Sequence, residues 1–216
     1  MNFTTSVWKD IEPLYESIIE HPFNTELMKG ILDKQKFSFY VNQDALYLAD
    51  FARALSIIAG RSEDTNAVLQ FSQFAESAIV VEMSLHKSFI DKFEIRMCKE
   101  KSPACFSYTN YLLSTCLLQS YEAGAASLLP CFWIYREVGN HIYANSAKNN
   151  IYEDWINTYS GEEFSTAVDN MIDIFNALAD KASTITKEKM KEAVIRSTKL
   201  EYMFWDSAYR MERWVI

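Results

Sequence analysis

Residues that make turns are rare in this sequence, and that rarity limits the folds the chain can form. Only 5 Gly and 4 Pro occur among its 216 residues, about 4% of the chain against roughly 12% in average proteins. A β-sandwich, barrel or propeller needs many tight turns, whose backbone angles glycine and proline supply. We therefore predict long helices with short connections, an all-α fold.

Apolar periodicity and capping residues divide the chain into helical stretches. Ser102 and Pro103 form an N-cap and a first helical residue, and Asn24 is read as the N-cap of a short helix that stops at Gly30. No linker rich in Pro, Gly or Ser separates the stretches, so we predict a single helical domain, residues 1–216. The expected helices are 7–19, 24–30, 33–59, 62–93, 102–119, 121–145, 151–158, 161–181 and 186–214.

Charge and composition argue against several classes of protein. The net charge of −8 disfavours binding to nucleic acid, where Lys and Arg supply most of the affinity. Residues 102–135 carry one formal charge, Glu122, but polar residues and Pro130 interrupt the stretch, so we expect no membrane span. The acidic first 21 residues lack a signal-peptide core, and the four cysteines form no C-x-x-C pair. We expect reduced thiols in a cytoplasmic protein.

Two carboxyl groups interrupt helix stripes that are otherwise apolar. Asp44 stands in the stripe Phe37, Val41, Asp44, Leu48, Phe51, Leu55. Glu201 stands in the stripe Met190, Val194, Ser197, Glu201, Phe204, Ala208, Met211. An ionised carboxylate in a core costs several kcal/mol unless it is paired or hydrogen-bonded. A salt bridge or a helix cap would explain one such residue, but two of them, with Tyr40 and Tyr47 on the face of Asp44, favour a binding site.

Cys131 stands in the least charged part of the chain, among residues with special backbone roles. Pro130 lacks an N–H and its ring clashes with a carbonyl one turn earlier, which predicts a bend just before the thiol. Tyr135 lies one turn further on and can share the face of Cys131. Gly124 predicts the close approach of another helix. The remaining cysteines are interpreted as buried structural residues: Cys98, Cys105 and Cys116.

Two glutamate–histidine pairs leave a metal-dependent function open. Glu82 and His86 are four residues apart, as are Glu137 and His141, and di-iron bundles use similar pairs three apart. A di-metal site that uses Glu82, His86, Glu122 or His141, or a haem oxidase on the same fold, is therefore an alternative. The sequence has no phosphate-binding Gly-rich loop, G-x-S-x-G elbow or HExxH motif, which argues against nucleotide-dependent and serine-hydrolase chemistry.

Six short motifs stand in order along nearly the whole chain: His21-Pro22-Phe23, Phe39-Tyr40-x-x-Gln43-Asp44-x-x-Tyr47-Leu48, Tyr108-Thr109-x-Tyr111-Leu112, Leu128-Leu129-Pro130-Cys131-x-Trp133-x-Tyr135-x-Glu137-Val138-Gly139, Trp155-x-x-x-Tyr159, and Glu201-x-x-Phe204-Trp205-Asp206-x-Ala208-Tyr209. This ordered set resembles the TenA family, also called thiaminase II or aminopyrimidine aminohydrolase. The presence of Cys131 resembles its cysteine-dependent branch. The resemblance implies a helical bundle like that of haem oxygenase, without a required haem, other cofactor or metal, assembled as a homotetramer.

The resemblance also implies an activity, that of a hydrolase in thiamin salvage. Family members convert 4-amino-5-aminomethyl-2-methylpyrimidine to the 5-hydroxymethyl compound and ammonia, and many also cleave thiamin to hydroxymethylpyrimidine and the thiazole alcohol. By this resemblance Cys131 is the nucleophile that adds to the pyrimidine ring, and Glu201 donates and accepts a proton beside it. Asp44 binds the amino-pyrimidine edge, and the pocket is lined by Tyr47, Tyr108, Tyr135 and Tyr159.

Two questions stay open at this level. One alternative is a non-catalytic protein that binds a pyrimidine, or regulates through it, with the same pocket. The other open point is the group that deprotonates Cys131, for which Glu201 and a tyrosine are both candidates.

Overall fold

The computed structural model describes residues 2–215, apart from the side chains of residues 81–86, and this part of the chain contains nine α-helices and no strand. The predicted all-α fold is confirmed. The helices are α1 (Phe3–Ile19), α2 (Pro22–Met28), α3 (Lys34–Arg61), α4 (Thr65–Phe93), α5 (Pro103–Leu118), α6 (Tyr121–Asn145), α7 (Glu153–Ser160), α8 (Glu162–Lys181) and α9 (Thr184–Arg210).

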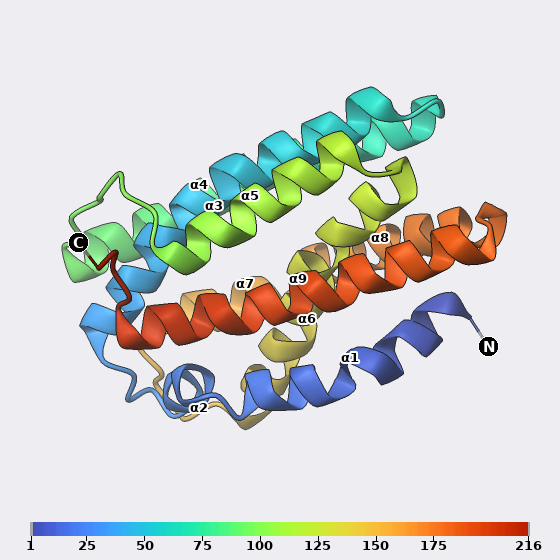
Figure 1. Ribbon diagram of the computed structural model, residues 1–216. Coiled ribbons are helices and arrows are strands. Elements are labelled where there is room, and N and C mark those ends of the chain that lie inside the picture. Colours follow the sequence, from blue (N-terminus) through green and yellow to red (C-terminus); the bar gives the residue numbers. More distant parts are fainter. Residues whose placement is uncertain (1, 216) are drawn as a thin grey trace.

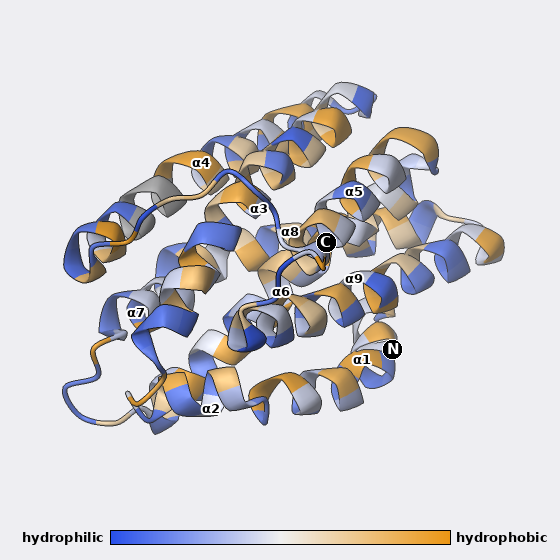
Figure 2. Ribbon diagram, turned by 60° about the vertical axis from the view of Figure 1, so that its left-hand side comes forward, coloured by the Kyte–Doolittle hydropathy of each residue, from blue (hydrophilic) through white to orange (hydrophobic). Residues whose placement is uncertain are grey.

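Helix α9 runs through the middle of the bundle, where it packs against α1, α3, α5 and α6 (Figure 1). On one side α3 packs along α4 and α5, and on the other α6 contacts α7 and α8. Hydrophobic and hydrophilic residues alternate around the helices (Figure 2), as amphipathic packing requires. The three helices that carry Asp44, Cys131 and Glu201 therefore meet in the interior. No helix of the described chain is both long and apolar enough to cross a membrane.

Two glycines allow α6 to approach its neighbours closely. A Cβ at Gly124 would lie 2.7 Å from Cδ1 of Ile58 in α3 and 3.2 Å from Cα of Cys116 in α5. A Cβ at Gly139 would lie 2.7 Å from the carbonyl carbon and oxygen of Tyr159 in α7. The close approach predicted at Gly124 is confirmed, and Gly139 has the same role for the helix that carries Tyr159.

The N-cap of α2 is His21, so the prediction of an N-cap at Asn24 was wrong. The Nδ1 atom of His21 accepts a hydrogen bond from the backbone N–H of Phe23 over 3.1 Å. Pro22 then takes the first helical position, which suits its fixed φ. Asn24 lies inside the helix, where its Nδ2 donates to the carbonyl of Ile18 over 2.9 Å.

Three helices are followed by a residue in the left-handed conformation, and after α4 this residue is Glu94, with φ of 51°. Gly30, with φ of 70°, follows α2 as predicted. Met211, with φ of 49°, ends α9 after Arg210, so the last helix is shorter than the predicted 186–214. The left-handed turn lets the N–H of Met211 donate to a carbonyl of the final helical turn.

Candidate active site

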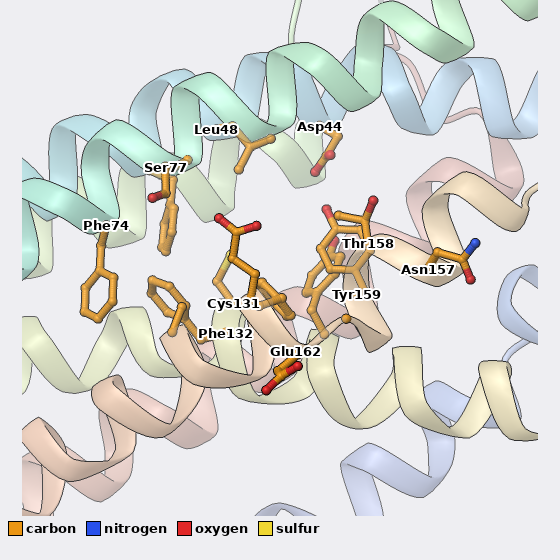
Figure 3. A pocket seen from close by; sticks show the side chains of 17 residues that line it. Asp44, Leu48, Phe74, Ser77, Cys131, Phe132, Asn157, Thr158, Tyr159 and Glu162 are labelled. Atoms are coloured by element: carbon orange, nitrogen blue, oxygen red, sulfur yellow. The ribbon is translucent and has the colours of Figure 1, made fainter.

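A cavity of about 320 Å³ opens between α3, α4, α6, α7 and α8. Its volume lies at the lower end of the range for ligand pockets, about 300–1,000 Å³, which suits one small ring compound. Asp44 from α3 faces Cys131 from α6 across it, and Tyr159 closes the α7 side (Figure 3). Tyr135 also lines it. The other lining residues are Leu48, Phe51, Phe74, Ser77, Ala78, Phe132, Asn157, Thr158, Gly161, Glu162, Glu163, Phe164 and Ala167.

Three further candidate residues, Tyr47, Tyr108 and Glu201, are not among the residues that line the cavity but form a buried cluster next to Cys131. Tyr108 Oη donates a hydrogen bond to Oε1 of Glu201 over 2.7 Å. The rings of Tyr47 and Tyr108 lie 4.9 Å apart between centroids. The Cys131 thiol is close enough to both tyrosines to contribute to their raised pKa values. All seven candidate residues thus belong to one region, four on the cavity wall and three beside it.

Glu201 is the titratable group with the clearest chemical consequence. Its side chain is only 1% exposed, and its hydrogen-bond partner is the Tyr108 hydroxyl rather than a cation or a helix end. The pKa of Glu201 is raised to about 8: burial is the largest cause, the hydrogen bond from Tyr108 lowers the pKa in part, and the nearby Asp44 adds to the rise. The carboxyl group is therefore mostly protonated at neutral pH, which suits a donor of a proton to a ring nitrogen.

Three tyrosines of the candidate site stay protonated as well. Burial, the largest cause, raises the pKa of Tyr47, Tyr108 and Tyr135 well above the usual value. Among the described residues, the buried Tyr47 Oη has no hydrogen-bond partner of ordinary geometry, and the Cys131 thiol and Tyr108 hydroxyl are its close polar neighbours. A buried hydroxyl without a hydrogen bond is costly, so Tyr47 is ready to donate to a thiolate at Cys131 or to a bound molecule.

Cys131 is the cysteine that lines the cavity, and it is partly exposed there. Cys105 and Cys116 are buried, and burial raises the pKa of each thiol to about 12, which makes both unreactive. Cys98 is exposed, so its interpretation as a buried residue was wrong. Helix α6 continues past Pro130 without interruption, and the bend expected there stays a prediction.

Helical spacing placed Tyr40 on the face of Asp44, but no individual role was predicted for Tyr40, Trp155 or Trp205, which pack on the candidate site. Trp155 Nε1 donates to Tyr40 Oη over 3.2 Å, and Tyr40 Oη donates to Tyr135 Oη over 3.5 Å. The ring of Trp205 lies 4.9 Å from that of Tyr135. A weak signal was present, because Tyr40 and Trp155 each stand four residues before a candidate site residue.

The glutamate–histidine pairs form no evident metal site in the described structure. Among the side chains it describes, no three His, Cys, Asp or Glu are grouped so as to hold a metal ion. Glu122 lies in a separate groove at the surface, and Glu137 pairs with Arg136, with 3.0 Å between Oε1 and Nη2. The side chains of Glu82 and His86 lie outside the described residues.

The fold and the candidate site define a class of protein, a haem oxygenase-like helical bundle with a cysteine and a buried carboxyl group at an internal cavity. A domain of unknown function with a heme oxygenase-like fold from Shewanella denitrificans is similar at a TM-score of 0.72 and 12% identity, over 96% of this chain and 92% of that one. This likeness shows the fold. The chain belongs to the TENA/THI-4/PQQC family, whose model matches residues 8–211.

Individual relatives agree with this assignment. A Bacillus subtilis protein named aminopyrimidine aminohydrolase is 34% identical over 204 residues, which cover 93% of this chain and 86% of that protein. The crystal structure of a TenA homologue from Pyrococcus furiosus has a TM-score of 0.90 at 25% identity, over 95% of this chain and 99% of that one. The TenA resemblance seen in the motifs is therefore confirmed.

Proposed function

We propose that this protein is an aminopyrimidine aminohydrolase of thiamin salvage, which converts 4-amino-5-aminomethyl-2-methylpyrimidine and water to the 5-hydroxymethyl compound and ammonia. The observation that carries the proposal is the buried Glu201, which accepts a hydrogen bond from Tyr108 beside the cavity that Cys131 lines. The name of the Bacillus subtilis relative supports the same activity. The aromatic walls suit the flat face of a pyrimidine, and the Asp44 carboxylate suits its amino edge.

In the proposed mechanism, Cys131 and Glu201 act on the ring together. The sulfur forms a bond to a ring carbon, the π pair moves to a ring nitrogen, and Glu201 protonates that nitrogen. The resulting Glu201 carboxylate accepts the thiol proton. The ring is then no longer aromatic, so its electrons expel the side-chain amine, which takes the proton now held by Glu201 and leaves as ammonia. Water adds to the methylene and gives a proton back to the Glu201 carboxylate. Loss of sulfur from the ring restores aromaticity, which divides one difficult substitution into two easier steps.

The raised pKa values of the tyrosines favour Glu201 over a tyrosine as the base that deprotonates the Cys131 thiol. The pKa values of Tyr47 and Tyr108 lie well above the usual value. Both hydroxyls are therefore already protonated at neutral pH and serve as hydrogen-bond donors instead of bases. Tyr47 is the hydroxyl placed to stabilise the thiolate of Cys131. We therefore assign the proton exchange to Glu201 and the binding roles to the Asp44, Tyr47, Tyr108, Tyr135 and Tyr159 side chains.

The proposal extends to four wider properties: cleavage of thiamin, the domain organisation, the location and the assembly. Thiamin has the same pyrimidine with another leaving group on the methylene, so the same steps would cleave it. We infer one catalytic domain over residues 1–216, supported by the match over 8–211, and a cytoplasmic location, supported by the free thiols of Cys98, Cys105 and Cys116. We also infer a homotetramer. Exposed apolar side chains on α4 and α5 support an interface: Leu69, Val80, Leu117 and Leu118. Light scattering on the purified protein tests that assembly.

The activity is tested by measuring ammonia and hydroxymethylpyrimidine release from the aminomethylpyrimidine. Cys131→Ala should lower turnover by at least about a thousandfold, since the covalent step is lost. Cys98→Ala, which removes an exposed thiol away from the cavity, is the matched control and should retain wild-type turnover. Unimpaired turnover in Cys131→Ala would overturn the nucleophile assignment. Tight pyrimidine binding by wild-type protein with no product would instead indicate a binding protein.

A further inference from the structure

A chain of two hydrogen bonds leads from the interior to the cavity, and its first donor fixes its direction. An indole N–H can only donate, so Trp155 donates to Tyr40 Oη, over 3.2 Å. Tyr40 has one hydroxyl hydrogen, which it donates to Tyr135 Oη over 3.5 Å. Trp155 and Tyr40 are each 1% exposed and Tyr135 is 4% exposed, so bulk water does not compete for these bonds.

The direction of this chain determines what Tyr135 offers to the cavity. Because its oxygen accepts from Tyr40, its own hydrogen is directed elsewhere, and Tyr135 is a residue of the cavity wall. It also lies one helical turn after Cys131 on α6. Burial raises the pKa of Tyr135 well above the usual value, so the hydroxyl keeps the hydrogen that it presents.

We propose that Trp155 and Tyr40 are positioning residues that hold the Tyr135 hydroxyl as a hydrogen-bond donor toward the bound aminopyrimidine. The inference rests on the proposed function for the identity of the ligand. Without the indole N–H, the Tyr40 oxygen loses the donor that fixes its direction and can accept from Tyr135, so the hydrogen bond between the two hydroxyls can reverse. In a fraction of the molecules, Tyr135 would then donate to Tyr40 and present only its lone pairs to the substrate. Those molecules would lack the hydrogen bond from Tyr135 to the aminopyrimidine.

The structure provides a matched control for the loss of an indole N–H. Trp205 is also fully buried and packs on Tyr135, with 4.9 Å between ring centroids. The corresponding distance for Trp155 is 6.5 Å. Within the part of the chain that the structure describes, the Nε1 atom of Trp205 has no hydrogen-bond partner, so Trp205→Phe removes a buried indole beside Tyr135 without removing a directing bond.

The test is a double-mutant cycle with Tyr135, since only a residue that acts through Tyr135 should be coupled to it. We would measure kcat, KM and the melting temperature for Trp155→Phe, Tyr135→Phe and the double variant, using the aminomethylpyrimidine. Trp155→Phe should lower kcat/KM about three- to tenfold in the wild-type background, the range that corresponds to one hydrogen bond. It should lower kcat/KM less than twofold when Tyr135 is already Phe.

Trp205→Phe should change kcat/KM by the same factor in the wild-type protein and in Tyr135→Phe, because it removes no hydrogen bond that directs the Tyr135 hydroxyl. An equal cost of Trp155→Phe in both backgrounds would overturn the positioning role and leave only packing. If Trp155→Phe does not fold, as judged by its melting curve, Tyr40→Phe takes its place. This substitution removes the second donor of the relay, the hydrogen-bond chain from Trp155 through Tyr40 to Tyr135.

The design separates this inference from the proposed function. If the wild-type protein releases no ammonia, the proposed activity fails. The affinity for hydroxymethylpyrimidine, measured by calorimetry, then replaces kcat/KM in the same cycle. Coupling of the Trp155 and Tyr135 substitutions in that affinity would still support the relay, and strict additivity would overturn it.

Discussion

Tyr108 Oη donates a hydrogen bond to Glu201 Oε1 over 2.7 Å, and both side chains are buried. A hydrogen bond donated to a carboxylate favours its charged form, whereas burial favours its neutral form. Burial is the larger effect here, and the pKa of Glu201 is raised to about 8. Tyr108 thus keeps the carboxyl group near the point where it can both give and take a proton at neutral pH.

Tyr108→Phe should move the alkaline limb of activity to higher pH. The hydrogen bond from Tyr108 lowers the pKa of Glu201. Without it, the pKa should rise above about 8 by up to about one unit. Glu201 with a higher pKa gives its proton to the substrate less readily, so kcat should fall about tenfold. The measurement is kcat/KM against pH. Tyr209→Phe removes a similar 2.8 Å bond to Glu26 and should leave the limb in place. A limb that moves to lower pH in Tyr108→Phe would contradict this account.

Glu201→Gln should change how stability depends on pH. With a pKa of about 8 in the folded protein and about 4.3 unfolded, Glu201 holds its proton more tightly when folded. Its contribution is fully present below about pH 4, and is lost as pH rises through 8. Urea unfolding between pH 6 and 9 should show a decline of a few kcal/mol in the wild type that is smaller in Glu201→Gln. Glu26→Gln, at a partly exposed pair, should keep the wild-type slope. Equal slopes in wild type and Glu201→Gln would exclude a raised pKa.

The two buried carboxyl groups could be predicted from the sequence because their signal is local. Helical spacing alone put Asp44 and Glu201 at core positions, and they are 3% and 1% exposed. The all-α fold followed in the same way from the scarcity of turn residues. Helix ends were less certain, since His21 and Asn24 can both cap a helix and only the packing of α2 decides between them.

The relay from Trp155 to Tyr135 could not be predicted in this way. Its three members come from α7, α3 and α6, and their contacts depend on how those helices pack. Helical periodicity places a residue on a face but says nothing about which residue of another helix it meets. The same limit explains why Tyr108 was assigned to the pocket wall by resemblance, while its structural partner is Glu201.

Gly139→Ala should disturb Tyr159 through the backbone. The new Cβ would lie 2.7 Å from the carbonyl carbon and oxygen of Tyr159, which are not the flexible end of a side chain and cannot turn away. We expect a loss of about 1–3 kcal/mol in the free energy of unfolding and a higher KM for the pyrimidine. Chemical denaturation and steady-state kinetics measure the two effects.

The control for this substitution is Gly60→Ala, because a Cβ there meets nothing within 4 Å. Gly60 lies inside α3, so alanine should stabilise the protein by up to about 1 kcal/mol through helix propensity alone. If Gly139→Ala were as stable as Gly60→Ala, the close approach of α6 and α7 would not depend on the glycine.

His21 should make the protein less stable in mild acid. Its Nδ1 accepts from the N–H of Phe23 over 3.1 Å, which requires an unprotonated nitrogen. Burial lowers the pKa of His21, while Asp206, at 3.6 Å from Nε2, and Glu26 act in the opposite direction. Burial is the larger effect, so the folded protein binds the proton less tightly than the unfolded chain.

Because the pKa of His21 is lower in the folded protein than in the unfolded chain, protonation at acidic pH destabilises the folded protein. The stabilising contribution of neutral His21 is present above the unfolded pKa of about 6.5, and it is lost as pH falls below that value through the lower folded pKa. His21→Asn keeps an oxygen that can cap α2 but does not titrate. Between pH 7.5 and 5, the melting temperature should therefore fall more in the wild type than in His21→Asn, with loss of the cap worth about 0.5–2 kcal/mol. His141→Asn, at a histidine that caps no helix, should follow the wild type, and an identical decline in all three proteins would show that the α2 cap does not titrate.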